Sequence, residues 1–274
     1  MSDVLEDLSQ DAVVDAIEGN LVTLANFLGG STRVKLRHDS DVTWYVSDVP
    51  FPLLNGVMHA KLEPGSEDRR IGEILAEFEV AGMPMLWWTG PASRPEDIGS
   101  RLAGRGLMKV GAPPGMAMVL GKLDAGEAPP PGVTIKRLDG DHMLDGYGQV
   151  LQQAFGAPDF VKEIYYDIFK SSGYDEAGDV QNYVAYLEGT PVGTCTVVYG
   201  AGVAGIYNVA TVEEARGRGI GRAVTLGPLL DARRRGYRVG VLEASDMAYN
   251  LYRQNGFEEY CLIEQYLYMP GAGQ

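Results

Sequence analysis

The residues of this sequence best suited to chemistry lie in the stretch 216–222, which reads Arg-Gly-Arg-Gly-Ile-Gly-Arg. The apolar run 205–209 before it predicts a strand, and 220–235 has the length and composition of a helix. Because the three glycines lack a Cβ, the backbone can take positive φ angles and turn several N–H groups toward one point. A helix start adds partial positive charge there. The stretch therefore predicts an anion site surrounded by Arg216, Arg218 and Arg222.

The spacing of this loop separates it from two common phosphate-binding motifs. No Gly-Lys-Ser/Thr ends it, as a P-loop requires, and its glycines lack the offsets of the Gly-x-Gly-x-x-Gly dinucleotide fingerprint. An ordinary helix entry is the alternative interpretation. The residues 216, 219 and 221 form Arg-x-x-Gly-x-Gly, and 248–257 read Ala-Tyr-Asn-Leu-Tyr-Arg-Gln-Asn-Gly-Phe. The first motif resembles the pyrophosphate loop of the GNAT superfamily of acyl-CoA-dependent N-acyltransferases, and the second resembles its Ala-x-x-Leu-Tyr-x-x-x-Gly-Phe signature.

The two motifs stand in the family's order, and the resemblance covers about half the chain, 133–269. It implies a site for acetyl-CoA, in which the end of the strand holds the pantetheine arm and the loop holds the pyrophosphate, mainly through main-chain N–H groups. The sheet of such proteins splays after this strand, which opens a slot for the arm. Ser245 departs from the pattern, because many relatives have an asparagine there. The implied coenzyme-binding residues are Asn208, Val209, Ala210, Thr211, Arg216, Gly217, Arg218, Gly219, Ile220, Gly221, Arg222, Ala223, Ser245 and Tyr252.

Tyr252 is also the predicted general acid. When an amine attacks the thioester, coenzyme A leaves as a thiolate, which a nearby phenol can protonate; the tyrosine of this signature has that role in many relatives. The alternative is an aromatic residue that only packs the last helix on the sheet. Glu243, near the end of the strand after the coenzyme helix, is the predicted general base, and Tyr207 and Glu264 are weaker candidates.

The composition is that of a soluble globular protein, with 45% hydrophobic and 22% charged residues among 274. A net charge of −14 argues against nucleic acid or an anionic membrane as a partner. Seven of the twelve Lys and Arg residues in 131–274 lie within 216–238. This basic island suits a polyanionic ligand such as coenzyme A, although Arg233, Arg234 and Arg235 fit a solvated helix end equally well.

Several kinds of site and segment are not expected. The two cysteines imply no disulfide framework. No apolar run reaches the ~18 residues of a membrane span, and no signal peptide opens the sequence, so a cytoplasmic protein is expected. The histidines are single and scattered, so neither a metal site nor a catalytic triad is expected; they are His38, His59 and His142.

A linker divides the sequence. Residues 124–132 read Asp-Ala-Gly-Glu-Ala-Pro-Pro-Pro-Gly, which continues neither a helical nor a strand pattern. The domain 133–274 follows the GNAT order of elements, and the element order of 1–123 echoes it. The turn at 90–97 of the first domain has one glycine and two carboxylates, whereas the loop 216–222 of the second has three glycines. The same turn predicts a capping box formed by Ser93 and Glu96. We therefore expect 1–123 to be a degenerate GNAT-like domain; an unrelated α/β domain is the alternative.

The expected fold is α/β, or α+β: two GNAT-like domains, each with a mixed, mostly antiparallel sheet flanked by helices. The expected reaction is acetyl transfer from acetyl-CoA to a primary amine by direct attack in a ternary complex, without a covalent enzyme intermediate. A non-catalytic acyl-CoA-binding sensor or carrier is the alternative. The expected acceptor is a small-molecule or peptide amine, and the acidic composition favours a cationic one such as a polyamine, an aminoglycoside or a lysine-bearing peptide. A monomer or a homodimer is expected, with no metal.

Overall fold

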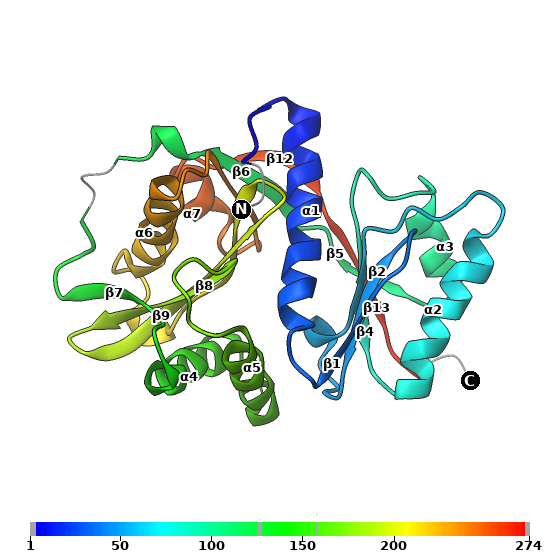
Figure 1. Cartoon of the computed structure of the whole chain (residues 1–274), viewed down its shortest axis with the longest axis horizontal. Coiled ribbons are helices and arrows are strands. Elements are labelled where there is room, and N and C mark those ends of the chain that lie inside the picture. Colours follow the sequence, from blue (N-terminus) through cyan, green and yellow to red (C-terminus); the bar gives the residue numbers. More distant parts are fainter. Residues whose placement is uncertain (1–3, 125–127, 157, 272–274) are drawn as a thin grey trace.

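Two sheets lie side by side in this protein, with the helix α1 (Gln10–Leu28) between them (Figure 1). The structure is a computed structural model and describes residues 4–124, 128–156 and 158–271. In these residues the first sheet has the strand order β1-β2-β3-β4-β13-β5, and the second has β12-β6-β11-β10-β9-β8-β7. The first sheet consists of Val34–His38, Thr43–Ser47, Gly56–Met58, Met85–Thr89, Glu264–Tyr268 and Met108–Gly111 in that order. The second consists of Glu258–Leu262, Pro114–Val119, Val239–Glu243, Val203–Thr211, Thr190–Gly200, Val180–Leu187 and Val133–Arg137.

Helices cover the faces of both sheets, which confirms the predicted fold (Figure 1). The helices beyond α1 are α2 (Glu67–Ala81), α3 (Ile98–Gly104), α4 (Leu144–Phe155), α5 (Asp159–Ser172), α6 (Ile220–Arg234) and α7 (Tyr249–Gln254). Short 3-10 turns lie at Pro52–Leu54, Leu120–Lys122, Asp141–Met143 and Glu213–Ala215. Among the described helices, none is long and apolar enough to cross a membrane.

The predicted capping box before α3 is wrong. The helix begins at Ile98, four residues later than the sequence pattern suggested, and no side chain caps it. The hydroxyl of Ser93 instead accepts a hydrogen bond from the N–H of Gly90 at 3.0 Å. Ser93 therefore closes the turn at 90–93 instead of capping a helix.

One strand from each half of the sequence lies in the sheet of the other half. β6 pairs antiparallel with β11 and β12 of the second sheet, while β13 pairs antiparallel with β4 and β5 of the first. Separating the halves would break both pairs of ladders. The division into 1–123 and 133–274 stays a prediction, and residues 125–127 of the predicted linker lie outside the described residues.

Each half also contains a parallel strand–helix–strand unit. β3 and β4 pair in parallel across α2, as β10 and β11 do across α6. Two residues beyond the last paired residue, His59 and Asn208 both have positive φ angles, 55° and 51°. The counterpart of the 216–222 loop is therefore the connection 59–66, and the comparison with the turn 90–97 was wrong.

That connection differs from the 216–222 loop in its charge. Its N–H at Gly65 donates to the Glu67 carboxylate at 2.8 Å, and Asp68 follows in the first turn of α2. A carboxylate of the chain itself occupies the anion position, so phosphate would meet like charge there.

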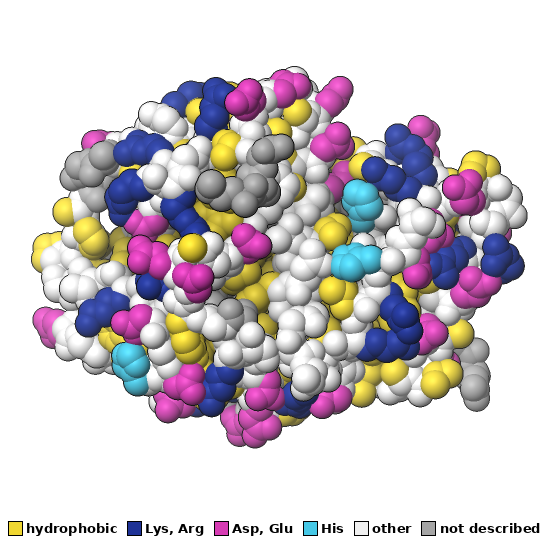
Figure 2. Space-filling model, viewed as in Figure 1, with side chains coloured by type: hydrophobic (Ala, Val, Ile, Leu, Met, Phe, Trp, Pro, Cys, Tyr) yellow, Lys and Arg dark blue, Asp and Glu magenta, His cyan; other side chains and the backbone are white. Residues whose placement is uncertain are grey.

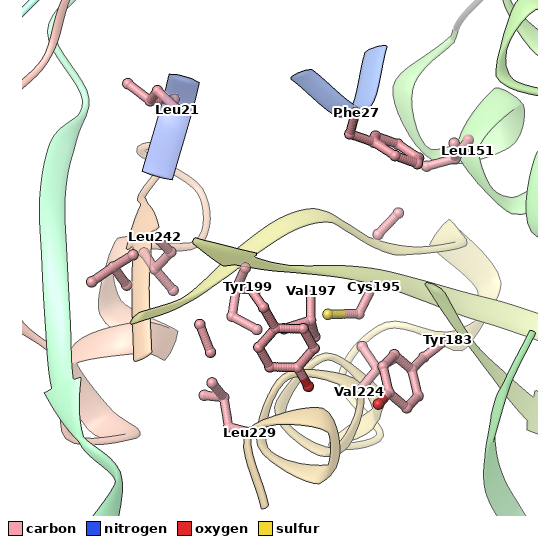
Figure 3. Close-up of a cluster of buried hydrophobic side chains, with 14 of the residues drawn as sticks. Leu21, Phe27, Leu151, Tyr183, Cys195, Val197, Tyr199, Val224, Leu229 and Leu242 are labelled. Atoms are coloured by element: carbon pink, nitrogen blue, oxygen red, sulfur yellow. The ribbon is translucent and has the colours of Figure 1, made fainter. Parts of the chain in front are cut away.

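The helix α1 is held on the second sheet by a fully bonded asparagine. The amide of Asn20 donates to the carbonyl oxygens of Val198 and Gly200, both at 3.0 Å, and its oxygen accepts from the Tyr207 hydroxyl at 2.8 Å. A Cβ at Gly205 would lie 1.8 Å from that oxygen, so glycine is required for this close approach. Figure 3 shows the two faces of the sheet: Leu21 and Phe27 of α1 on one, and Val224 and Leu229 of α6 on the other.

Candidate functional site

The 216–222 loop turns into α6 through two glycines in the left-handed region. Gly217 has φ 73° and Gly219, which caps the helix, has φ 75°. The N–H of Ala223 donates to the carbonyl of Gly219 at 3.0 Å. Because the N–H groups of a first helical turn have no intrahelical acceptor, those of Ile220 and Gly221 are available to an anion. Gly217 and Gly219 therefore have the positive φ angles that the sequence predicted, whereas Gly221 lies within the helix.

The arginines around the loop have different roles. Arg216 donates through Nε to the carbonyl of Thr211 at 3.2 Å, and Arg222 donates to the Asn255 side chain. Farther along, Arg233 binds the carbonyl oxygens of 120 and 123, and Arg235 binds those of 176 and 178. Lys and Arg side chains gather over the region of α6 (Figure 2). Within the basic island 216–238, only the residues near the loop lie where they can contact a ligand bound at the loop.

The second sheet splays beside this loop. β10 and β11 pair only from Ala204 to Ile206 of β10, whereas β10 runs on to Thr211. Its register against β9 shifts between Tyr207 and Ala210, around Asn208. The carbonyl of Asn208 accepts from the Thr194 hydroxyl at 2.9 Å, and its amide donates to the Thr196 hydroxyl at 3.2 Å. These bonds fix the bulge, and the edge of β10 beyond it is left without a strand partner on the β11 side within the described part of the chain.

A cavity of about 470 Å³, here called the loop cavity, lies at the splay. It is lined by most of the residues that the sequence implied: Val209, Ala210, Thr211, Arg216, Gly217, Gly219, Ile220, Gly221, Arg222, Ser245 and Tyr252. Three others lie elsewhere. Asn208 lines a different cavity, Ala223 faces the side of α6 toward the linker, and Arg218 is exposed.

A second cavity of about 270 Å³, here called the inner cavity, lies between the two sheets. The sequence predicted as site residues only Tyr207, Asn208, Val209, Glu243, Ser245 and Tyr252 of its walls, because the others come from segments far apart in the chain. The first sheet and its turn contribute Tyr45, Leu53, Met58, Trp88 and Gln265, and α1 contributes Leu21, Leu24, Phe27 and Leu28. The second half contributes Phe155, Tyr165, Ile206, Tyr207, Asn208, Val209, Glu243, Ser245, Ala248 and Tyr252.

Comparison with known proteins finds a family model that matches part of the second half. Residues 178–259 match the family model described as the acetyltransferase (GNAT) domain. This part of the chain is therefore similar to the GNAT acetyltransferase domain. No curated protein matches the sequence.

Solved structures extend the likeness to the whole chain. A GCN5-related N-acetyltransferase from Kribbella flavida is 17% identical over 92% of this chain and 96% of its own, with a TM-score of 0.68. A tandem GNAT protein from the clavulanic acid biosynthesis pathway is 15% identical over 99% of this chain and 98% of its own, with a TM-score of 0.60. At such identities the likeness is one of fold. Both halves of the chain therefore share the tandem GNAT fold.

Tyr252 lines both cavities. The two cavities also share Phe155, Val209, Ser245 and Ala248, so they meet at this tyrosine. Its side chain is only 5% exposed and packs edge-on against the ring of Phe257, with centroids 5.7 Å apart. Burial raises its pKa, and no hydrogen bond to its hydroxyl is found among the described residues. The phenol is thus protonated at neutral pH and has its proton available.

Glu243 ends β11, one residue beyond the last pair with β10. It lines the inner cavity, and its Oε1 is buried without a hydrogen-bond partner in the described part of the chain. Burial raises its pKa to about 7, and a hydrogen bond with Gln265 opposes that rise. Gln265 lies on β13, the strand of the second half that pairs in the first sheet. At neutral pH this carboxyl group is poised to accept a proton.

The weaker base candidates have other partners. Glu264 is ion-paired with Lys109 at 2.5 Å and accepts from the Tyr266 hydroxyl at 2.6 Å, which together lower its pKa. It lines a different cavity, at the edge of the first sheet. Tyr207 donates its hydroxyl proton to Asn20, and burial raises its pKa. Glu264 therefore differs from Glu243 in its lowered pKa, and the Tyr207 hydroxyl differs from Glu243 Oε1 because it is already hydrogen-bonded.

Proposed function

We propose that this protein transfers an acetyl group from acetyl-CoA to a primary amine by direct attack within a ternary complex. The observation that carries the proposal is the meeting of two cavities at Tyr252, one beginning at the anion-binding loop and the other containing Glu243. A transferase of this kind needs two substrates to reach one point from different sides, and the two joined cavities provide such an arrangement.

Acetyl-CoA would occupy the loop cavity. Its pyrophosphate would bind the N–H groups at 217–221 and the nearby Arg216 and Arg222, because backbone donors and a helix start favour an anion. Its pantetheine arm would lie along the unpaired edge of β10, at Val209 to Thr211, and would form hydrogen bonds as an added strand does. This places the thioester beside Tyr252.

The amine would enter through the inner cavity. Glu243 takes a proton from the ammonium group, and the nitrogen lone pair attacks the thioester carbonyl carbon. The carbon–sulfur bond then breaks, and Tyr252 gives its proton to the leaving thiolate. After the attack the nitrogen still carries one proton more than the amide product, and this proton passes to the Tyr252 phenolate, whose raised pKa favours its capture. A sensor or carrier of acyl-CoA would need the loop cavity, but it would need neither the proton acceptor Glu243 nor the proton donor Tyr252.

Substitution of the helix-capping glycine tests the coenzyme site. Gly219→Glu should weaken acetyl-CoA binding at least tenfold in a calorimetric titration, because it places bulk and negative charge at the anion position and strains a residue with φ 75°. Gly236→Glu is the matched control: it lies just beyond the other end of α6, also has positive φ (96°), and has open space around its Cβ position. Equal binding by both variants, or no binding by the unmodified protein, would refute the proposed coenzyme site.

A further inference from the structure

The walls of the inner cavity are mainly apolar and aromatic. Tyr45 and Trp88 stand on adjacent parts of the first sheet, where a Cβ at Gly56 would lie 2.3 Å from the Trp88 ring and 3.0 Å from the Tyr45 ring. The glycine between them lets both rings occupy one face of the sheet. Phe27 of α1 and Phe155 of α4 add two more rings to the lining. Such a surface favours an aromatic ligand, since ring pairs contribute beyond the area they bury.

Glu243 is the only acidic residue among the described residues that line this cavity, and no Lys, Arg, Asp or His is among them. One carboxylate can take the proton of one ammonium group. A second ammonium group in the same cavity would be buried without a partner, which costs far more than an exposed ion pair returns. The net charge of −14 therefore comes mostly from acidic residues that do not line this cavity, and it does not make the cavity a site for a polycation.

Two of the cavity's phenolic hydroxyls are already used within the protein. The Tyr45 hydroxyl donates to the carbonyl of Leu53 at 3.1 Å, and the Tyr207 hydroxyl donates to Asn20 at 2.8 Å. A ligand rich in hydroxyl groups, such as an aminoglycoside, would leave several of them unsatisfied on burial. The volume of about 270 Å³ also lies just below the range of typical ligand pockets, which begins near 300 Å³. A compound with one ring fits this size better than one with several.

We propose that the acetyl acceptor is an arylalkyl monoamine, a primary amine joined by a short chain to a single aromatic body. The ring lies among Tyr45, Trp88 and Phe27, and the amino group lies at Glu243 with the thioester beyond it at Tyr252. This inference rests on the proposed acetyl transfer and names its acceptor class. It replaces the expectation of a polyamine or aminoglycoside, which came from overall charge.

An acceptor panel with acetyl-CoA tests the inference, with thiol release as the measurement. We expect kcat/KM for 2-phenylethylamine to exceed that for spermidine and for kanamycin by at least 100-fold, because burial of unpaired charge and unsatisfied hydroxyl groups disfavours the last two. Faster transfer to spermidine or kanamycin would overturn the acceptor class while leaving acetyl transfer intact. If acetyl-CoA binds tightly by calorimetry and no amine causes thiol release, the acceptor class and the proposed transfer would both be refuted, and the coenzyme site alone would stand. Loss of acetyl-CoA binding itself would refute the proposed function and the acceptor class together.

A second carboxylate in the cavity should alter the preference. Leu53 lines the inner cavity and is 49% exposed, so Leu53→Asp can fold with a new acid at the wall. The ratio of kcat/KM for 1,4-diaminobutane to that for 2-phenylethylamine should rise at least tenfold, because the second ammonium group gains a partner. Val80→Asp is the control, since Val80 lies on α2, is 90% exposed and lines neither cavity. An unchanged ratio in Leu53→Asp would contradict the charge argument.

Discussion

Replacing Glu243 with Gln should lower kcat/KM for the amine by about 10²- to 10⁴-fold at pH 8, the usual contribution of a general acid or base. In the unmodified protein log kcat/KM should rise with pH and level off above about 7, because the base must be deprotonated and its pKa is raised to about 7 by burial. The variant should lose this limb of the profile. A pH–rate profile of both proteins checks the result, and an unchanged limb in Glu243→Gln would assign it to another group.

The same substitution should stabilise the protein at alkaline pH. A carboxyl group whose pKa is raised in the folded state contributes stability that is present below its unfolded pKa, near 4.5, and is lost as pH rises through about 7. Since each unit of pKa corresponds to 1.36 kcal/mol, Glu243→Gln should gain about 3 kcal/mol in free energy of unfolding at pH 8. The gain should shrink toward pH 4.5. Urea unfolding at both pH values measures it.

Glu264→Gln serves as the control for this pair of measurements. Its carboxylate is stabilised by Lys109 and Tyr266, and its pKa is lowered. Stability from such a group is present above its unfolded pKa and is lost as pH falls, so the substitution should destabilise the protein at pH 8, the opposite sign from Glu243→Gln. Its kcat/KM should stay near that of the unmodified protein, because Glu264 does not line the inner cavity.

The loop and its helix could be predicted from sequence because their determinants are local. Positive φ angles at Gly217 and Gly219 follow from residue type, and the helix start follows from the next fifteen residues. The pairing of β6 and β13 with the opposite sheets could not be predicted, since a strand's pattern says which face is buried and not which edge it joins. The turn at 90–97 was mistaken for the counterpart of the loop for a related reason. Only the parallel pairing of β3 with β4 shows that the connection 59–66 holds that position.

One part of the candidate site could likewise be predicted from the sequence, and the other part could not. Tyr252 and the loop belong to contiguous motifs, and Glu243 follows from the position of the splay, so sequence reasoning reached all three. The walls of the inner cavity depend on contacts between residues as distant in sequence as Phe27, Trp88 and Gln265. No periodicity or spacing in the sequence relates these positions. Most of the loop cavity could therefore be predicted from sequence, whereas the inner cavity can be described only after α1 and β13 are placed.

Tyr252→Phe should lower kcat by about 10²- to 10⁴-fold while leaving the Kd of acetyl-CoA unchanged. The substitution keeps the ring that packs against Phe257 and removes only a hydroxyl with no hydrogen-bond partner among the described residues, so neither the fold nor the loop cavity should change. What is lost is the proton for the leaving thiolate, an interaction made during the transfer and absent from the bound ground state. Initial rates of thiol release and calorimetry with acetyl-CoA separate these two effects.

Tyr249→Phe on the same helix is the matched control. Its hydroxyl donates to Glu259, and its side chain lines neither cavity, so the same loss of one oxygen should leave kcat and Kd unchanged. If Tyr252→Phe retains full kcat, the thiolate leaves without its help and Tyr252 serves only as a packed aromatic residue. If the unmodified protein binds acetyl-CoA and releases no thiol with any amine, the sensor or carrier role would hold. A large fall in kcat confined to Tyr252→Phe is the result that only a catalytic phenol produces, because packing and coenzyme binding are the same in both variants.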